Sequence, residues 1–440
     1  MVEWGRNVNP NCITKIGTIL LLIFAPLLTM FMVTCCLEYD GNIGSVLSDL
    51  YKLNFIYFPK FNLKVFLMLC TWILFQYILA LLPDRLTQLC SSYKGGFREG
   101  QHTPAGNILT YNINGLQSWM ITHILFFVFS YMGIIDPAII AKSWAELFVG
   151  ANVIGYCFCT IMYIKARVSP THPEDDKYTG NFFYDYMMGI EFNPAIFGVD
   201  VKLFWNGRPG IIAWTLINAS FTALQYQKYG LITDSILVLN FLQGLYVLDF
   251  FWNENWYLKT IDIAHDHFGW YFAWGDAVWL PFCYTLQAVY LASNPIVLGN
   301  INSLIILLIG ISGYILFRWT NYQKDDFRSN PENCIIWGTK AKYIECEYKT
   351  KTGIHTSKLL ISGFWRLARH MNYTGDIILS TAYCLVCGFN HITPYFYAVY
   401  MITLLIIRCY RDEQRCKLKY SQQWTSYCNK VKYRLIPHLY

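Results

Sequence analysis

Residues 16–37 read IGTILLLIFAPLLTMFMVTCCL, a run of 22 residues without a single charged side chain. An α-helix rises about 1.5 Å per residue, so about 20 apolar residues cross the ~30 Å hydrocarbon core of a bilayer. Nine further apolar segments follow, at 65–82, 116–135, 144–164, 210–226, 235–252, 268–292, 303–319, 376–389 and 393–408. This pattern predicts an all-α integral membrane protein with about ten transmembrane helices.

Composition points to the same class. Hydrophobic residues make up 55% of the 440 residues and charged residues 14%, whereas a typical soluble protein is about 25% charged. Soluble, collagenous, disordered and secreted disulfide-rich classes are therefore excluded. Several of the 15 cysteines lie inside apolar runs, so we expect buried free thiols. Cys384 and Cys387 form a CxxC with no second one nearby, and we predict no metal site.

Basic charge is concentrated in the last third of the chain, where 18 of the 34 lysines and arginines follow residue 317. An even number of spans places both termini on one side of the membrane. The positive-inside bias then predicts a basic cytosolic face. We expect the first apolar run to be a retained anchor, and polar loops over 83–115 and 165–209.

The first unusual segment is 252–271, WNENWYLKTIDIAHDHFGWY. A charged Asp or Lys at the centre of a membrane helix costs about 2.5–3.5 kcal/mol, so its ionisable groups suggest a functional site. On one continuous helix, Lys259, Asp262 and Asp266 would share one side of a cavity. A solvated interfacial loop is the alternative. His265 and His267 would point about 200° apart on such a helix and could not share a metal ion.

The second unusual segment is the basic face, where Lys and Arg are interleaved with aromatic and amide side chains over 318–328, 336–338, 360–373 and 411–427. Basic groups bind phosphate and aromatic faces stack on a flat base, so this pattern favours a pocket for an anionic cofactor. A polybasic patch against anionic lipid is the alternative. The sequence lacks GxGxxG after a strand, GxxxxGK[ST], HExxH and GxSxG, so a soluble-type dinucleotide fold, an NTPase, a zincin and a serine hydrolase are unsupported.

Several long motifs resemble the sterol reductase family, which includes the Δ14-sterol reductases and the membrane part of the lamin B receptor. They are FYDYMMGIEFNP at 183–194, NGRPG at 206–210, HDHFG at 265–269 and RHMNY at 369–373, and the resemblance covers the chain from about residue 60. HDHFGWY at 265–271 is similar to members that reduce the C7–C8 double bond, because Δ14 members usually read HDGFGFM there. KGG at 94–96 and TPAG at 103–106 point the same way.

The resemblance implies ten membrane helices, NADPH as the hydride donor and a sterol substrate that enters from the bilayer. The NADPH-binding positions of the family correspond to Lys324, Arg328, Leu360, Trp365, Asn372, Tyr373, Asp412, Cys416, Lys417, Leu418, Lys419, Tyr420 and Tyr427. These positions fall on the basic, aromatic segment already singled out. The C-terminal pattern is also weakly similar to isoprenylcysteine carboxyl methyltransferases, so S-adenosylmethionine is the rival cofactor. The residues also leave open a Δ14-sterol reductase, a non-catalytic sterol-binding protein and a transporter.

The expected chemistry requires a proton, because no carbonyl polarises a ring alkene toward hydride attack. An acid must lie on one side of the sterol and the hydride donor on the other, in a dry cavity. The candidate donors are Asp266 or Glu254, kept protonated by burial, with His265 as a relay and Tyr271 or Tyr257 as alternatives.

We expect one polytopic domain over 1–440, with N-terminal membrane helices and loops in 1–250 and a catalytic half in 251–440 that holds the sterol cavity and the NADPH region. Expected partners are the sterol, membrane lipid and other sterol-biosynthesis enzymes, with no nucleic acid. The expected location is the endoplasmic reticulum membrane, or the cell inner membrane in a bacterium.

Overall fold

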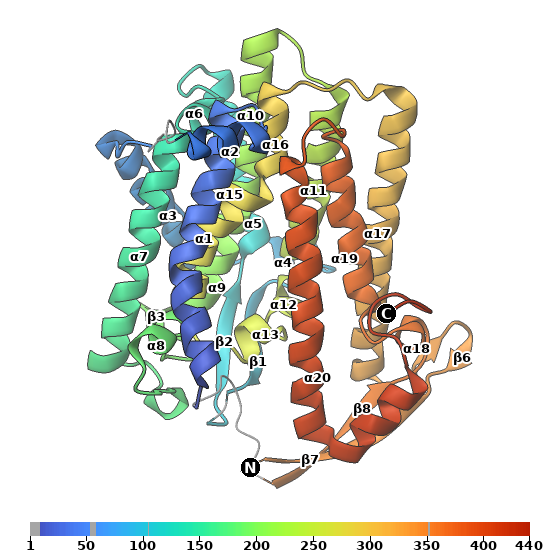
Figure 1. Cartoon of the computed structure of the whole chain (residues 1–440). Helices are drawn as coiled ribbons and strands as arrows, with labels where there is room; N and C mark the ends of the chain where they lie inside the picture. Colours follow the sequence, from blue (N-terminus) through green and yellow to red (C-terminus); the bar gives the residue numbers. More distant parts are fainter. Residues whose placement is uncertain (1–8, 53–58, 104, 351–352) are drawn as a thin grey trace. The chain divides into compact units, whose positions relative to one another are not determined.

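The computed structural model describes residues 9–52, 59–103, 105–350 and 353–440 and is mostly helical (Figure 1). The chain forms two compact units. The larger unit runs to Val297 and includes Asn390–Pro394. The smaller unit comprises Leu298–Phe389 and Tyr395–Tyr440.

Six long helices form most of the larger unit: α1 (Cys12–Glu38), α3 (Leu63–Leu81), α5 (Gly115–Tyr131), α7 (Trp144–Val168), α10 (Ile211–Tyr229) and α11 (Asp234–Trp252). Asparagine begins several helices, because its side-chain oxygen accepts a backbone N–H of the first turn. Asn11 does so at α1 and Asn62 at α3. The core between α5, α10 and α11 contains Trp214, Val247 and Phe251, all fully buried.

Short elements connect these helices. They are α2 (Ile43–Tyr51), α4 (Leu86–Leu89), β1 (Gly96–His102), β2 (Ile108–Ile113), α6 (Ile139–Lys142), η1 (Pro173–Asp175), α8 (Phe182–Met188), β3 (Ala195–Ile196), β4 (Val199–Asp200), α9 (Val201–Trp205) and the π-helical turn η2 (Asn206–Gly210). Strands β1 and β2 pair antiparallel, with Gly96 opposite Ile113. The expected polar loop over 83–115 therefore contains a β-hairpin.

The span expected at 268–292 is broken. It consists of α14 (Trp270–Trp274), the π-helical turn η3 (Gly275–Trp279), α15 (Leu280–Tyr284) and α16 (Leu286–Ser293). Proline has no N–H to donate to the preceding turn, so Pro281 interrupts the regular ladder of helical hydrogen bonds. The Thr285 hydroxyl then donates to the Pro281 carbonyl at 2.6 Å, where α15 ends.

The smaller unit contains α17 (Gly299–Ser329), β5 (Ile335–Ile336), β6 (Thr339–Lys340), β7 (Tyr343–Thr350), β8 (Gly353–Leu360), α18 (Phe364–Leu367), α19 (Met371–Leu385) and, after the short turn η4 (Thr393–Tyr395), α20 (Phe396–Lys430). Helices α17 and α19 pack backbone to backbone. A Cβ added to Gly375 would lie 2.6 Å from the Gly313 carbonyl oxygen. Helix α20 is kinked at Ser421, whose φ is +47°.

Among the described residues, six helical segments are long and apolar enough to cross a membrane. They are α1, α3, α7, α11, α17 and the segment Thr393–Lys430, which confirms a multi-pass membrane protein. The other four predicted spans correspond to α5, α10, the broken α14–α16 segment and the 15-residue α19. The all-α expectation was too strict, because the described chain also contains four two-stranded sheets.

Candidate functional site

The segment after α11 is not one helix. It consists of α12 (Glu254–Tyr257), α13 (Ile261–Ala264) and a non-helical stretch that reaches α14 at Trp270. The prediction that Lys259, Asp262 and Asp266 share the face of one helix is therefore wrong. The helix is interrupted because this stretch makes a tertiary contact with a distant part of the chain. The Phe268 N–H donates to the Glu191 carbonyl at 3.0 Å, which holds the stretch in an extended form.

Two of the sequence motifs meet at this stretch. A Cβ on Gly269 would lie 2.2 Å from the Gly189 nitrogen and 2.4 Å from the Met187 carbonyl oxygen. The backbones of 187–191 and 268–269 therefore touch directly, and a glycine is required at 269 for this approach. The separate resemblances at 183–194 and 265–269 are parts of one structure.

Asp266 and Tyr271 form the clearest pair among the predicted catalytic residues. The Tyr271 hydroxyl donates to Asp266 Oδ2 at 2.7 Å, and Asp266 is buried. A phenol hydrogen-bonded to a buried carboxyl group can hold and deliver a proton. The sequence predicts both residues, but only as alternatives to each other.

Lys202 fixes the backbone beneath this pair. Its ammonium donates to the carbonyl oxygens of Ile263 at 2.7 Å and Asp266 at 2.6 Å, and lies 4.2 Å from the centroid of the Phe192 ring. The side chain is fully buried. Burial lowers the pKa of Lys202 to about 8, although the nearby Asp200, Asp266 and Asp262 oppose this shift. Sequence reasoning missed Lys202, because one lysine in VKLFW gives no chemical signal.

Glu254 lies in a buried ion pair. Arg208 Nη1 donates to Glu254 Oε1 at 2.5 Å, and the Gly115 N–H donates to Oε2 at 2.8 Å. The second guanidinium nitrogen donates to Asn114 Oδ1 at 3.0 Å. Both carboxylate oxygens of Glu254 therefore accept hydrogen bonds, and one of them faces the Arg208 guanidinium. The NGRPG motif contains Arg208, but the sequence did not show that Arg208 would pair with Glu254.

The two remaining catalytic candidates lie nearby. Tyr257 packs beside a buried cluster that contains Tyr111 and Ile263. His265 ends α13 and is half-buried, with its N–H on the Ile261 carbonyl at 2.9 Å. All five candidates therefore belong to the larger unit.

The predicted cofactor residues gather in the smaller unit. The Lys324 ammonium lies 4.2 Å from the centroid of the Trp365 ring, and the Trp365 indole donates to the Thr320 carbonyl at 2.9 Å. Leu360 and Trp365 share a buried cluster with Phe327. Helix α17 thus presents Lys324 to an aromatic face supplied by α18.

Helix α20 contributes the second part of this group. Asp412 pairs with Arg415 at 2.5 Å, and the Lys419 ammonium lies 3.9 Å from the centroid of the Tyr348 ring. The Tyr420 hydroxyl donates to Ser357 Oγ at 3.3 Å. Cys416, Tyr420, Trp424 and Tyr427 form one buried cluster, whereas Lys417 and Leu418 are exposed.

Helix α19 supplies the last predicted cofactor residues. The Asn372 amide donates to Asn321 Oδ1 at 3.2 Å, which links α19 to α17. Tyr373 stacks on His370, with ring centroids 5.0 Å apart and an interplanar angle of 7°. Burial lowers the pKa of His370 to about 4, so it is neutral at neutral pH.

The charges of this region do not cancel. Arg328 and Arg415 repel Lys324, and the same two arginines repel Lys419, whereas Asp412 attracts Lys324. Like charges gathered beside aromatic faces are unfavourable unless an anion joins them. The donor set therefore fits an anionic cofactor with an aromatic base.

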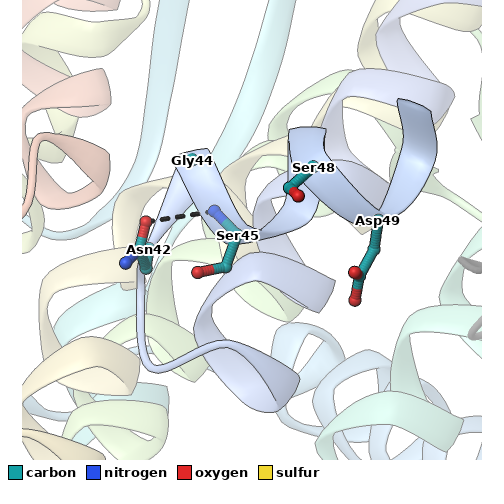
Figure 2. Close-up of a pocket in the computed structure, with 5 residues that line it drawn as sticks. All are labelled: Asn42, Gly44, Ser45, Ser48 and Asp49. Carbon is teal, nitrogen blue, oxygen red and sulfur yellow. Dashed lines mark hydrogen bonds between the residues drawn. The ribbon is translucent and has the colours of Figure 1, made fainter. Parts of the chain in front are cut away.

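A separate hollow lies at the start of α2 and is lined by Asn42, Gly44, Ser45, Ser48 and Asp49 (Figure 2). Asn42 Oδ1 accepts the Ser45 N–H at 3.2 Å, which is an ordinary helix cap. None of these lining residues belongs to the predicted catalytic or cofactor groups.

Comparison with known proteins shows which enzyme family the chain resembles along its whole length. A profile described as the ergosterol biosynthesis ERG4/ERG24 family matches residues 5–440. The chain is 50% identical to a 7-dehydrocholesterol reductase of Danio rerio over 448 aligned positions, which cover 100% of this chain and 94% of the relative. It is also 50% identical to a 7-dehydrocholesterol reductase of Xenopus laevis, with 100% and 95% covered. A Delta(14)-sterol reductase of Dictyostelium discoideum is 39% identical, with 77% and 72% covered.

Proposed function

Because the chain belongs to the ergosterol biosynthesis ERG4/ERG24 family, we propose that it reduces the C7–C8 double bond of a sterol with hydride from NADPH. The observation that carries the reaction is the 50% identity to 7-dehydrocholesterol reductases over the full chain. The protein is a multi-pass sterol reductase of sterol biosynthesis, with the activity of a 7-dehydrocholesterol reductase.

Full-length similarity is needed for this assignment. A 7-dehydrocholesterol reductase of Arabidopsis thaliana is 37% identical, slightly less than the 39% of the Delta(14)-sterol reductase of Dictyostelium discoideum. At this level, identity alone does not separate the two double-bond positions. The HDHFGWY stretch at 265–271 supports the C7–C8 assignment independently.

The basic group around Lys324 supports NADPH as the cofactor. NADPH carries a pyrophosphate and a 2′-phosphate, and such anions would offset the repulsion that Arg328 and Arg415 exert on Lys324 and Lys419. S-adenosylmethionine carries a sulfonium cation and no phosphate, so these cations would repel part of it. When bound, NADPH supplies the hydride.

The Asp266–Tyr271 pair is the proposed proton source. The Tyr271 hydroxyl donates to Asp266 Oδ2 at 2.7 Å, which holds a phenol beside a buried carboxyl group, and both are groups that can carry a proton. Protonation of the sterol alkene creates tertiary-cation character in the ring, which hydride then quenches at the adjacent carbon. We rank Glu254 below this pair, because both of its carboxylate oxygens are already engaged, one by Arg208 and the other by the Gly115 N–H. His265 and Tyr257 remain as a relay and an alternative donor.

The surroundings of the reaction are part of the same proposal. Ten spans with a basic cytosolic face, a sterol that enters from the bilayer and residence in the endoplasmic reticulum membrane agree with the family. In a bacterium the location would be the inner membrane. Membrane lipid and other sterol-biosynthesis enzymes are the proposed partners, and the catalytic half is proposed to begin near residue 251.

One experiment tests the reaction. The chain is expressed in membranes that lack sterol reductases, and 7-dehydrocholesterol or a Δ8,14-diene sterol is added with NADPH. Products are followed by gas chromatography with mass detection. We expect cholesterol from the first substrate and no conversion of the second. Conversion of only the second would contradict the C7–C8 assignment, and no turnover of either would favour a sterol-binding protein or a methyltransferase.

A further inference from the structure

The smaller unit carries a group of apolar side chains, most of them exposed, near the end of α17, in the β5–β6 hairpin and at the start of α18. We call Trp319, Tyr322, Ile335, Trp337 and Phe364 the aromatic patch. Trp337 is 55% exposed and Ile335 69% exposed, although both flank a buried strand residue. The Phe364 ring lies edge-on to both tryptophans, with centroids 5.1 Å from Trp337 and 5.9 Å from Trp319. Phe364 therefore joins the end of α17 to the β5–β6 hairpin.

The patch rests on a fixed base. Ile336 and Trp365, the sequence neighbours of Trp337 and Phe364, are buried together in one cluster. The Phe364 N–H donates to Gln323 Oε1 at 3.0 Å. Gly363 has a φ of +60°, and a Cβ there would lie 2.4 Å from the same oxygen. The inward side chains thus lock the backbone, and the outward orientation of the patch follows from that packing.

The tip of the hairpin is unusual for a turn in water. Trp337 and Gly338 connect β5 and β6, and both have positive φ, at +50° and +77°. Glycine, asparagine and aspartate fill such turns, because a bulky residue in the left-handed region costs of the order of 1 kcal/mol. A tryptophan that is strained and exposed at once points to an environment that favours it there.

The patch is continuous with the exposed, apolar side of α17. The exposed large apolar residues of this helix are Ile301, Leu304, Ile305, Leu308, Ile315, Trp319 and Tyr322. At 100° per residue these seven fall within an arc of about 100°, so they form one stripe along a helix that is apolar enough to cross a membrane. The stripe ends in the aromatic patch.

Two basic side chains lie beside the patch. Lys340, which is opposite Ile335 in the hairpin, is exposed, as is Arg366 beside Phe364 and Trp365. Tryptophan and tyrosine concentrate at the level of lipid headgroups, and basic side chains meet lipid phosphates at the same depth. Exposing these aromatic rings to water is unfavourable, whereas the membrane interface accommodates them.

We propose that the aromatic patch is a membrane anchor, in which the β5–β6 hairpin inserts Trp337 and Ile335 into the boundary between headgroups and acyl chains. The occupant of the patch is lipid of the bilayer that α17 crosses. Because Phe364 precedes Trp365, and Trp365 contacts Lys324, the anchor also fixes the depth of the basic group relative to the bilayer. The anchor does not depend on which cofactor that group binds.

The test places a fluorophore in the patch of the full chain. Cys12 and Cys157, the exposed cysteines, are replaced by serine, and bimane is attached to Trp337→Cys or to Ile335→Cys, which keeps Trp337. Asn333→Cys is the matched control, because Asn333 is exposed and polar in the same segment. Each protein is reconstituted in phosphatidylcholine vesicles with or without bromine on the acyl chains.

We expect brominated lipid to reduce the emission at positions 337 and 335 by about twofold and to leave position 333 unchanged. Equal emission in both lipids at 337 and 335 would overturn the anchor. If emission at 337 instead responds to NADPH and not to bromine, the patch belongs to the cofactor site, and the proposal is wrong.

Discussion

At the scale of single residues, the molecule depends on cations that are buried among carbonyls and carboxylates. Lys202 donates to two carbonyls of 263–266, so it positions the segment that carries Asp266. Because Lys202 contacts the backbone of this segment, we expect it to affect turnover by holding Asp266 in place.

Replacing Lys202 with methionine removes two hydrogen bonds to backbone carbonyls of this segment. We expect turnover to fall at least about tenfold, because the Asp266–Tyr271 pair loses its support. Lys228→Met, at an exposed position on α10, is the control and should behave as the parent chain. Unchanged kcat in Lys202→Met would remove the positioning role.

The pH dependence of stability gives a second readout for Lys202. Because its pKa falls to about 8 on folding, the unfolded chain binds more protons between about pH 8 and the ordinary lysine value of 10.5. The Lys202 contribution to the free energy of unfolding therefore rises with pH in this window. We expect the destabilisation by Lys202→Met to grow by about 1 kcal/mol from pH 7 to pH 9. Thermal midpoints of both proteins at the two pH values check this.

Asp266→Asn and Tyr271→Phe separate proton delivery from cofactor binding. Each should lower kcat at least about 100-fold, since general acid catalysis contributes that much, while the binding of NADPH is retained. Asp262→Asn, on the preceding short helix, is the control. Normal activity in Asp266→Asn would exclude this carboxyl group as the donor.

The basic group is tested by Lys324→Ala and Arg328→Ala. We expect the KM for NADPH to rise more than kcat falls, and the preference for NADPH over NADH to weaken where the 2′-phosphate is held. Arg366→Ala removes an exposed cation of the same unit and should change neither quantity. A selective loss of kcat would argue against a phosphate-binding role.

At the scale of elements, close helix packing in the smaller unit depends on two glycines. A Cβ on Gly375 would meet the Phe317 nitrogen at 2.5 Å, so Gly375→Ala must push α17 and α19 apart. We expect a loss of about 1–3 kcal/mol in stability. Gly244 in α11 has open space around it, and Gly244→Ala should instead stabilise by up to about 1 kcal/mol. If the two substitutions shift the thermal midpoint in the same direction relative to the parent chain, this packing argument is contradicted.

Hydropathy predicted where apolar helices occur but not where they break. The segment 268–292 was expected to be one span, because side-chain polarity carries no information about backbone hydrogen bonds. Pro281 was the available signal. The bend at 265–269 had none within its own sequence, since it depends on contact with 187–191, about 80 residues earlier.

Chemical reasoning selected Asp266 and Tyr271 because buried ionisable groups are costly wherever they occur. It could not pair them, because their hydrogen bond crosses from a non-helical stretch to a new helix. Lys202 and Arg208 were missed as partners for a related reason. A cation reveals its role only when the fold shows which carbonyls or carboxylates it meets.

At the scale of the whole molecule, the number of spans decides the side on which each end lies. In the part of the chain that the structure describes, six helical segments qualify as spans by length and composition, and the four shorter or broken segments bring the expected number to ten. Reporters fused before Met1 and after Tyr440 should both be accessible from the cytosol. Opposite locations would require an odd number of crossings and would contradict the ten-span proposal.

The buried pair of Arg208 and Glu254 also matters before the protein is finished. Arg208 leaves the ribosome 46 residues before Glu254, and α10 and α11 are made in between. Until Glu254 itself has been made, the guanidinium of Arg208 cannot form this ion pair in the nascent chain. We therefore expect α10 and α11 to insert together, with the Arg208–Glu254 contact forming as they pack. A chain that carries Glu254→Gln should be synthesised at the normal rate and then be degraded early by quality control.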